Sequence, residues 1–201
     1  MPARVFVAIE LPRATRQVIS GAVETFLTLE PSWRGEKAVA PDLLHVTLAF
    51  LGTVPEASLA PLLERLPGAL GPIAPFDLTL SGARAVPSRG HASMLWATLS
   101  GAEDDAAMLA SSIRREAGVP LDGRPFRAHV TLARSRRPRP IRAGAVEACS
   151  LILSAAGKAP DRTVSVHSAT VFSSTLGAAG PTYDRLAVLM LGTAGHSTTA
   201  R

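Results

Sequence analysis

The pentapeptide HVTLA occurs twice in this chain of 201 residues, beginning at His45 and again at His129. In a β-strand, side chains two positions apart point to the same face, so each copy places an imidazole beside a hydroxyl, Thr47 in one and Thr131 in the other. The repeat therefore predicts two related strands, one in each half of the chain. Brought face to face, they would flank one small anion with two titratable nitrogens, which suits acid–base chemistry on a phosphodiester.

Each copy alone is a weak signal, because a single histidine in an apolar strand is more often structural than catalytic. An exact five-residue repeat in a chain of this length arises by chance with a probability on the order of 1%, so the duplication favours function. A metal site is not indicated, since no Cys, Asp or Glu stands at ligand spacing from the histidines. No nucleophile-elbow sequence accompanies the threonines, which fit better as hydrogen-bond donors to phosphate oxygens.

Positive charge gathers beside the second copy. The net charge is +5, and only two of the 21 Lys and Arg residues are lysine. Seven of the arginines form a cluster along the sequence around the second copy. Because arginine binds phosphate oxygens bidentately, this cluster indicates a surface for nucleic acid or polyphosphate. The alternative is an ordinary solvated loop. The arginines between positions 124 and 142 are Arg124, Arg127, Arg134, Arg136, Arg137, Arg139 and Arg142.

Composition excludes several classes of protein. Hydrophobic residues make up 47% of the chain and charged residues 18%, which is typical of a globular protein. No apolar run reaches the 18 residues of a membrane span, and the apolar part of MPARVFVAIELP is too short for a signal peptide. Cys149 is the single cysteine, so no disulfide can form within the chain. A cytoplasmic location is expected.

Hydrophobic periodicity predicts a mixed α+β fold, because helices and strands alternate but hairpin-like turns also occur. One domain over residues 1–192 is expected, with 193–201 as a disordered tail. Two lobes related by a pseudo-twofold axis would bring both HVTLA strands to one cleft. Strands are expected at Arg4–Ile9, Leu44–Leu51, Phe76–Ser81, Ala92–Leu99, Phe126–Ala133, Thr163–Phe172 and Tyr183–Leu191, and helices at Thr15–Leu29, between Pro55 and Pro67, around Ala106–Ile113 and at Ile141–Leu153.

The two copies also match the paired HxTx motifs of the two-histidine (2H) phosphoesterase superfamily. The segments around them narrow the resemblance: RVFVAIELP, PDLLHVTLAFLGTV, FDLTLSG followed by LWATL, RPFRAHVTLAR and the late GxxGPTYDRL. In this order, from about Arg4 to Leu191, they resemble the bacterial and archaeal RNA 2′,3′-cyclic phosphodiesterases, historically called 2′-5′ RNA ligases.

This resemblance implies a bilobal fold in which each lobe is an antiparallel sheet with helices outside and the active-site cleft lies between the lobes. It implies that His45 is the proton donor to the leaving ribose oxygen and that His129 is the proton acceptor from the attacking water. Thr47 and Thr131 would hold the phosphate. The product would be a 2′-phosphomonoester, and neither a metal nor another cofactor is implied.

Five residues after each histidine stand Phe50 and Arg134, at equivalent positions of the two copies. The resemblance implies that both bind substrate, the aromatic ring by stacking on a base and the arginine by contacting phosphate. In a regular strand this position faces away from the histidine unless a bulge intervenes, so a core role for Phe50 stays open.

Hydrolysis of RNA 2′,3′-cyclic phosphate ends is the leading interpretation, with RNA or a related nucleotide as the partner, no membrane association and a monomer without an obligate protein partner. The same site could instead join RNA ends through a 2′-5′ bond or open a small cyclic phosphate, because ligation is the microscopic reverse with a ribose hydroxyl in place of water. A non-catalytic RNA- or nucleotide-binding module is the third alternative.

Overall fold

The computed structural model describes residues 3–87, 90–120, 123, 125–155, 160–177 and 180–192. Within this part of the chain the strands form one antiparallel sheet in the order β7–β4–β5–β6–β3–β1–β8–β9, and the short β2 pairs with β6. The expected tail at 193–201 lies outside the described residues. The strands are β1 (Ala3–Glu10), β2 (Lys37–Ala38), β3 (His45–Val54), β4 (Phe76–Val86), β5 (His91–Ser100), β6 (His129–Pro140), β7 (Thr163–Val166), β8 (Ser168–Gly177) and β9 (Gly180–Met190).

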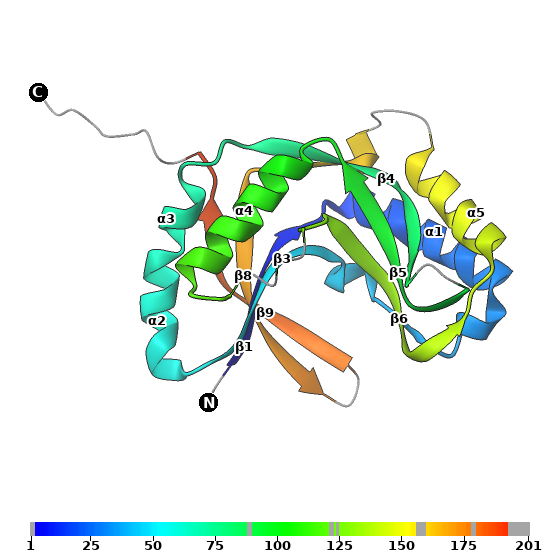
Figure 1. Ribbon diagram of the computed structural model, residues 1–201, viewed down its shortest axis with the longest axis horizontal. Coiled ribbons are helices and arrows are strands. Elements are labelled where there is room, and N and C mark those ends of the chain that lie inside the picture. The colour runs from blue at the N-terminus through cyan, green and yellow to red at the C-terminus, as the bar shows by residue number, and fades with distance from the viewer. Residues whose placement is uncertain are drawn as a thin grey trace, which may run out of the picture.

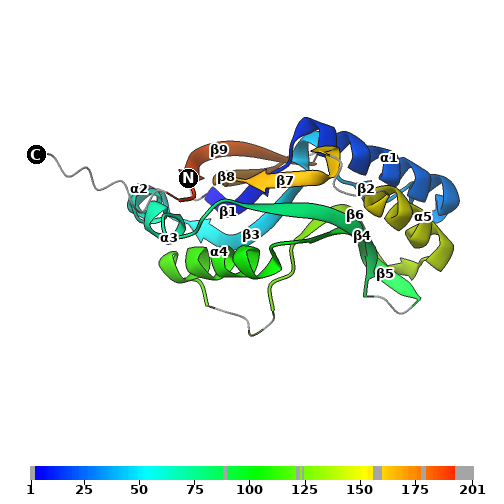
Figure 2. The same cartoon turned by 90° about the horizontal axis from the view of Figure 1, so that it is seen from above.

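Helices lie at the two ends of the sheet (Figures 1 and 2). The helix α1 packs beside α5, which packs against β4, whereas α4 packs against β3 and beside α3. The helix α1 therefore follows β1 but covers the half of the sheet that contains β4. Likewise, α4 follows β5 but covers the half that contains β3. The helices are α1 (Arg13–Leu29), α2 (Glu56–Arg65), α3 (Pro67–Leu70), α4 (Glu103–Glu116) and α5 (Ala143–Ser154), with 3₁₀ turns at Pro31–Trp33, Pro41–Leu43 and Pro160–Arg162.

The spacing of apolar residues explains where α1 forms and which face it buries. Its buried residues are Thr15, Ile19, Ala22 and Phe26, which recur at the spacing of one helix face. The helix ends at Leu29, two residues before Pro31, as expected because proline disfavours the helical conformation of the residue before it.

The sheet has two four-stranded halves that meet where β3 pairs with β6. One half is β3–β1–β8–β9 and the other is β6–β5–β4–β7, so each begins at the centre with one HVTLA strand. The α+β class with antiparallel half-sheets and outer helices is confirmed. Buried apolar side chains of both halves form one contiguous cluster.

One expected strand is wrong. The segment predicted as a single strand over Thr163–Phe172 divides at His167 into β7 and β8. β7 pairs with β4 at one edge of the sheet, and β8 pairs with β1 in the other half. The half with β1 and β3 is therefore completed by strands from the carboxyl-terminal part of the chain, so the two halves of the sheet are not the two halves of the sequence.

Candidate active site

The two HVTLA strands are direct neighbours at the centre of the sheet. β3 and β6 run antiparallel, and Val46 pairs with Val130. Both valines are fully buried, which sends the residues on either side of each valine to the opposite face. The side chains of the two histidines and two threonines are half-buried on that face, which we call the site face.

Each histidine is held by the same backbone contact. The Nδ1–H of His45 donates to the carbonyl oxygen of Leu43 over 2.7 Å, and that of His129 donates to the carbonyl oxygen of Arg127 over 2.8 Å. A carbonyl can only accept, so the proton belongs on Nδ1, and Nε2 of the neutral ring is left as the basic nitrogen. In His45, Nε2 lies 3.0 Å from Oγ1 of Thr47. Both rings therefore present Nε2 for proton transfer.

A β-bulge in β3 brings Phe50 to the site face. Thr47 pairs with Ala8 of β1, but Ala49 pairs with the next residue, Val7, which leaves Leu48 as an extra residue in β3. The extra residue reverses the alternation, and Phe50 consequently shares the face of Thr47. Its side chain is 68% exposed, so Phe50 is not a core residue.

The second copy contains the same bulge. Thr131 of β6 pairs with Trp96, whereas Ala133 pairs with Leu95, which leaves Leu132 as the extra residue. Arg134 therefore also shares the site face, and its side chain is exposed. The structure thus brings all six predicted site residues to one face of the two central strands.

Aromatic rings surround the first histidine. The ring of His45 lies 5.1 Å from that of Phe6 and 5.5 Å from that of Tyr183, which meets it edge-on. Phe6 also packs against Phe172 at 5.2 Å and lies 6.1 Å from Phe50. Phe6 and Phe172 form a small buried cluster on the site face, separate from the main core.

The second histidine has a different neighbour. The ring of His129 stacks on the indole of Trp96, with centroids 3.8 Å apart and an interplanar angle of 24°. The indole Nε1 is buried and makes no hydrogen bond to a described residue. Sequence reasoning missed both Trp96 and Tyr183, although LWATL and GPTYDRL contain them, because their contacts with the histidines are made between distant strands.

Burial and neighbouring charges lower the pKa of both histidines. For His45, burial is the largest cause, the Leu43 carbonyl opposes it, and the charge of His129 lowers the pKa further. For His129, burial is again the largest cause, the Arg127 carbonyl opposes it, and Arg134 lowers the pKa. Repulsion between the two imidazolium ions disfavours double protonation, so a state with one charged and one neutral ring is accessible.

The arginine cluster has two kinds of member. The Arg139 guanidinium pairs with Glu36, and the backbone N–H of Arg142 donates to Glu30 over 2.9 Å, so these two residues have structural contacts. The side chains of Arg134, Arg136 and Arg137 are exposed and have no carboxylate within ion-pair distance among the described residues, although the backbone N–H of Arg136 donates to Glu36 over 3.3 Å. Arg124 lies outside the described residues.

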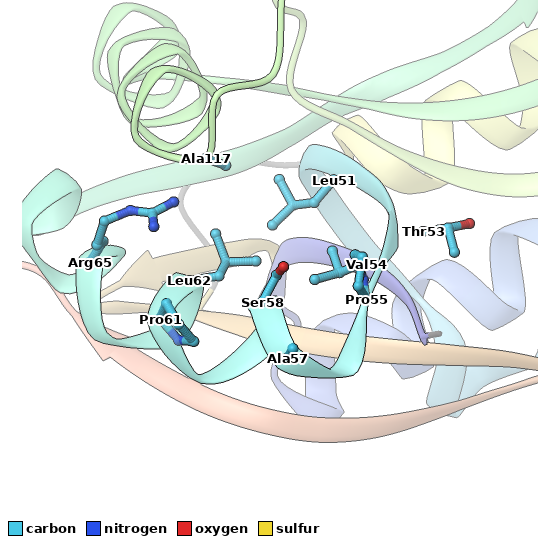
Figure 3. A pocket seen from close by; sticks show the side chains of 10 residues that line it. All are labelled: Leu51, Thr53, Val54, Pro55, Ala57, Ser58, Pro61, Leu62, Arg65 and Ala117. Carbon is cyan, nitrogen blue, oxygen red and sulfur yellow. The ribbon is translucent and has the colours of Figure 1, made fainter. Parts of the chain in front are cut away.

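A hollow of about 370 Å³ lies away from the histidines, between the end of β3, α2 and Ala117 (Figure 3). Its walls are mostly apolar and include Leu51 and Leu62, and none of the six predicted site residues lines it. In the described chain, no group of three or more His, Cys, Asp and Glu side chains is placed to hold a metal ion. No described helix is long and apolar enough to cross a membrane.

Two central antiparallel strands that each carry an HxTx motif define a 2H phosphoesterase. Comparison with known families agrees, because the model of the 2′-5′ RNA ligase superfamily matches residues 27–177. The chain belongs to this family.

Two relatives share the name RNA 2′,3′-cyclic phosphodiesterase. The protein of Geobacillus stearothermophilus is 33% identical over 139 residues, which cover 64% of this chain but only 41% of that protein. The protein of Archaeoglobus fulgidus is 31% identical over 140 residues, or 68% of this chain and 75% of the relative. The chain thus matches less than half the length of the first relative and three quarters of the second.

Solved structures show the same fold. TT0787 of Thermus thermophilus superimposes with a TM-score of 0.66 at 27% identity, over 94% of this chain and 98% of that one. Escherichia coli LigT without ligand gives a TM-score of 0.59 at 25% identity with the same coverage. LigT has also been solved in complexes with phosphate and with 3′-AMP.

Proposed function

We propose that this protein hydrolyses RNA 2′,3′-cyclic phosphate ends to 2′-phosphomonoesters by acid–base catalysis, without a metal or other cofactor. The observation that carries the proposal is the pairing of Val46 with Val130, which sets two histidine–threonine pairs side by side on one face. The relatives named RNA 2′,3′-cyclic phosphodiesterase support the same substrate.

In the proposed reaction, Nε2 of His129 accepts a proton from water as the water oxygen attacks phosphorus. The bond between phosphorus and the ribose 3′ oxygen breaks, and Nε2–H of His45 donates its proton to that oxygen. The products are a 2′-phosphomonoester and a free 3′ hydroxyl. Proton exchange with solvent then returns His45 to its charged form and His129 to its neutral form.

The surroundings of the rings support this assignment of roles. Arg134 lowers the pKa of His129 and so favours the neutral ring that a base requires. The charge that acts on His45 is that of His129 itself, which is absent when His129 is neutral. An anionic phosphate bound between the rings would favour the protonated form of His45.

The threonine hydroxyls of both motifs are proposed to donate to the non-bridging phosphate oxygens. Arg134 would add a charged donor from the same strand as His129, and Phe50 would offer an exposed ring on which the terminal base stacks. Such donors stabilise the charge that grows on the phosphate oxygens in the transition state.

Phosphorus NMR of an oligonucleotide that ends in a 2′,3′-cyclic phosphate tests the proposal directly. With excess chelator, the cyclic signal should convert to that of a 2′-monoester, and His45→Ala and His129→Ala should each abolish the conversion. Dependence on an added divalent metal, or full activity in either variant, would refute the mechanism. A new 2′-5′ diester signal in the presence of a second RNA would instead identify a ligase.

We also propose that residues 1–192 act as a single domain, as a monomer in the cytoplasm. The contiguous core shared by both half-sheets supports one folding unit. Sedimentation equilibrium should give the mass of one chain at all concentrations, and one cooperative unfolding transition should be seen by circular dichroism.

A further inference from the structure

The two halves of the sheet can be compared position by position, because both contain the same bulge next to the motif. In one half, Thr47 pairs with Ala8, and Ala8 pairs with Thr170 on the next strand. In the other half, Thr131 pairs with Trp96, and Trp96 pairs with Arg84. Directly paired residues project to the same side of an antiparallel sheet, so Arg84 lies on the site face.

The corresponding residues differ in charge and size. Thr170 is 2% exposed and donates to Glu10 over 3.0 Å, so its hydroxyl is used within the fold. Arg84 is exposed and has no carboxylate within ion-pair distance among the described residues. The half of the sheet with β1 therefore has small, neutral residues at these two positions. The half with β5 has instead an indole and, beside it, a guanidinium without an ion-pair partner in the described chain.

Cations on the first half are less suited to bind an anion near the motif. Arg185 of β9 is held by Glu10, with Nη2 and Nε lying 2.6 and 3.0 Å from the same carboxylate oxygen. Arg4 is exposed at the start of β1, four residues beyond Ala8 and hence about 13 Å along the strand. Arg84 stands level with Thr131 and only two strand spacings away, or about 10 Å between Cα atoms.

We propose that Arg84 binds the phosphodiester that precedes the terminal nucleotide of the RNA, and that Arg84, Trp96 and Arg134 form a track for the incoming strand. The inference rests on the proposed function, because the terminal phosphate must lie between the two threonines. From there, a phosphate one nucleotide upstream lies within reach of an arginine two strands away. The substrate class is thus a polynucleotide end, in preference to a cyclic mononucleotide that lacks this second phosphate.

The test compares two substrates with the same terminal nucleoside: uridine 2′,3′-cyclic phosphate and a hexanucleotide that ends in it. For the wild-type protein, kcat/KM should be about tenfold or more higher for the hexanucleotide, since a charged hydrogen bond contributes that much. Arg84→Gln should remove most of this preference and leave the mononucleotide unaffected. The matched control is Arg115→Gln, which removes the same charge from an exposed position on α4 and should change neither substrate.

Salt dependence gives an independent readout by binding rather than turnover. Affinity for a labelled hexanucleotide that ends in a 2′-phosphate should fall with salt, and Arg84→Gln should reduce the slope of log K against log salt by about 0.7, the value for one single-strand phosphate contact. Equal losses on both substrates, or no loss on either, would overturn the subsite. Inactivity of the wild-type protein on both substrates would refute the proposed hydrolysis, while the salt slope would still decide the role of Arg84.

Discussion

Arg134 lowers the pKa of the proposed base, His129, and is proposed to contact the substrate phosphate, so replacing it tests both roles. Its charge lowers the pKa of both His129 and Tyr183, although burial raises the pKa of Tyr183 overall. Arg134→Gln should therefore let the pKa of His129 rise toward its ordinary value. Because the base must be neutral, the acidic limb of the kcat/KM profile should move to higher pH.

The size of the loss in activity follows from the contact that Arg134 is proposed to make with the phosphate. A hydrogen bond to a charged group contributes about 1.5–3 kcal/mol, and the exposure of this side chain favours the lower end. A loss of about 1.5–2 kcal/mol corresponds to a decrease of about 10- to 30-fold in kcat/KM at the pH optimum. Below the optimum the decrease should be larger, because more of the base is then protonated.

Full pH profiles of kcat/KM for a cyclic nucleotide, at constant ionic strength, measure both effects. Arg134→Lys is the informative companion, because it keeps the charge and should leave the acidic limb in place while the bidentate contact is lost. Arg115→Gln controls for net charge. If Arg134→Gln leaves both the rate and the acidic limb unchanged, the guanidinium contacts neither the phosphate nor the base, and the assignment of roles loses its main support.

Three further predictions concern individual side chains around the site and in the core. Phe50→Ala should raise KM by about tenfold, as expected for the loss of one base–aromatic stack, while the melting temperature stays unchanged because the ring is 68% exposed; thermal unfolding and initial rates check this. In a Trp33→Phe background, the fluorescence of Trp96 should titrate with the His129 ring stacked on it, and a titration that survives His129→Ala would contradict that. Burial raises the pKa of the Cys149 thiol to about 12, so a thiol reagent at pH 8 should label the protein only after denaturation.

The central strands and most helices could be predicted from sequence because their signals are local. Period-two alternation located β3 and β6, and the 3.6-residue period located α1 and α4. The edge of the sheet that a strand joins depends on partners far away in the chain, so the sequence predicts one strand around His167 where the structure has two. The half of the sheet on which α1 packs likewise depends on partners far away in the chain.

The sequence contains a local signal for both bulges. In each copy two consecutive apolar residues, Leu48–Ala49 and Leu132–Ala133, interrupt the alternation, and all four are buried. An alternating strand would bury only one residue of each pair, so the interruption marks the extra residue. The positions of Phe50 and Arg134 were therefore encoded locally, whereas the contacts of Trp96 and Tyr183 depend on the assembled sheet.

The duplicated motif does not by itself distinguish an acid from a base. Both rings donate Nδ1–H to the carbonyl two residues earlier, and both are buried enough to lower the pKa. What differs is the residue that each bulge brings to the site face, the uncharged ring of Phe50 after His45 and the guanidinium of Arg134 after His129. In the proposed reaction, the residue five positions after each histidine determines which ring is neutral at the start. Exchanging Phe50 and Arg134 should therefore exchange the environments of the two histidines. NMR titration of the imidazole protons in the doubly exchanged protein should show a lower pKa for His45 and a higher pKa for His129 than in the wild-type protein, and unchanged titrations would show that this residue does not affect either ring.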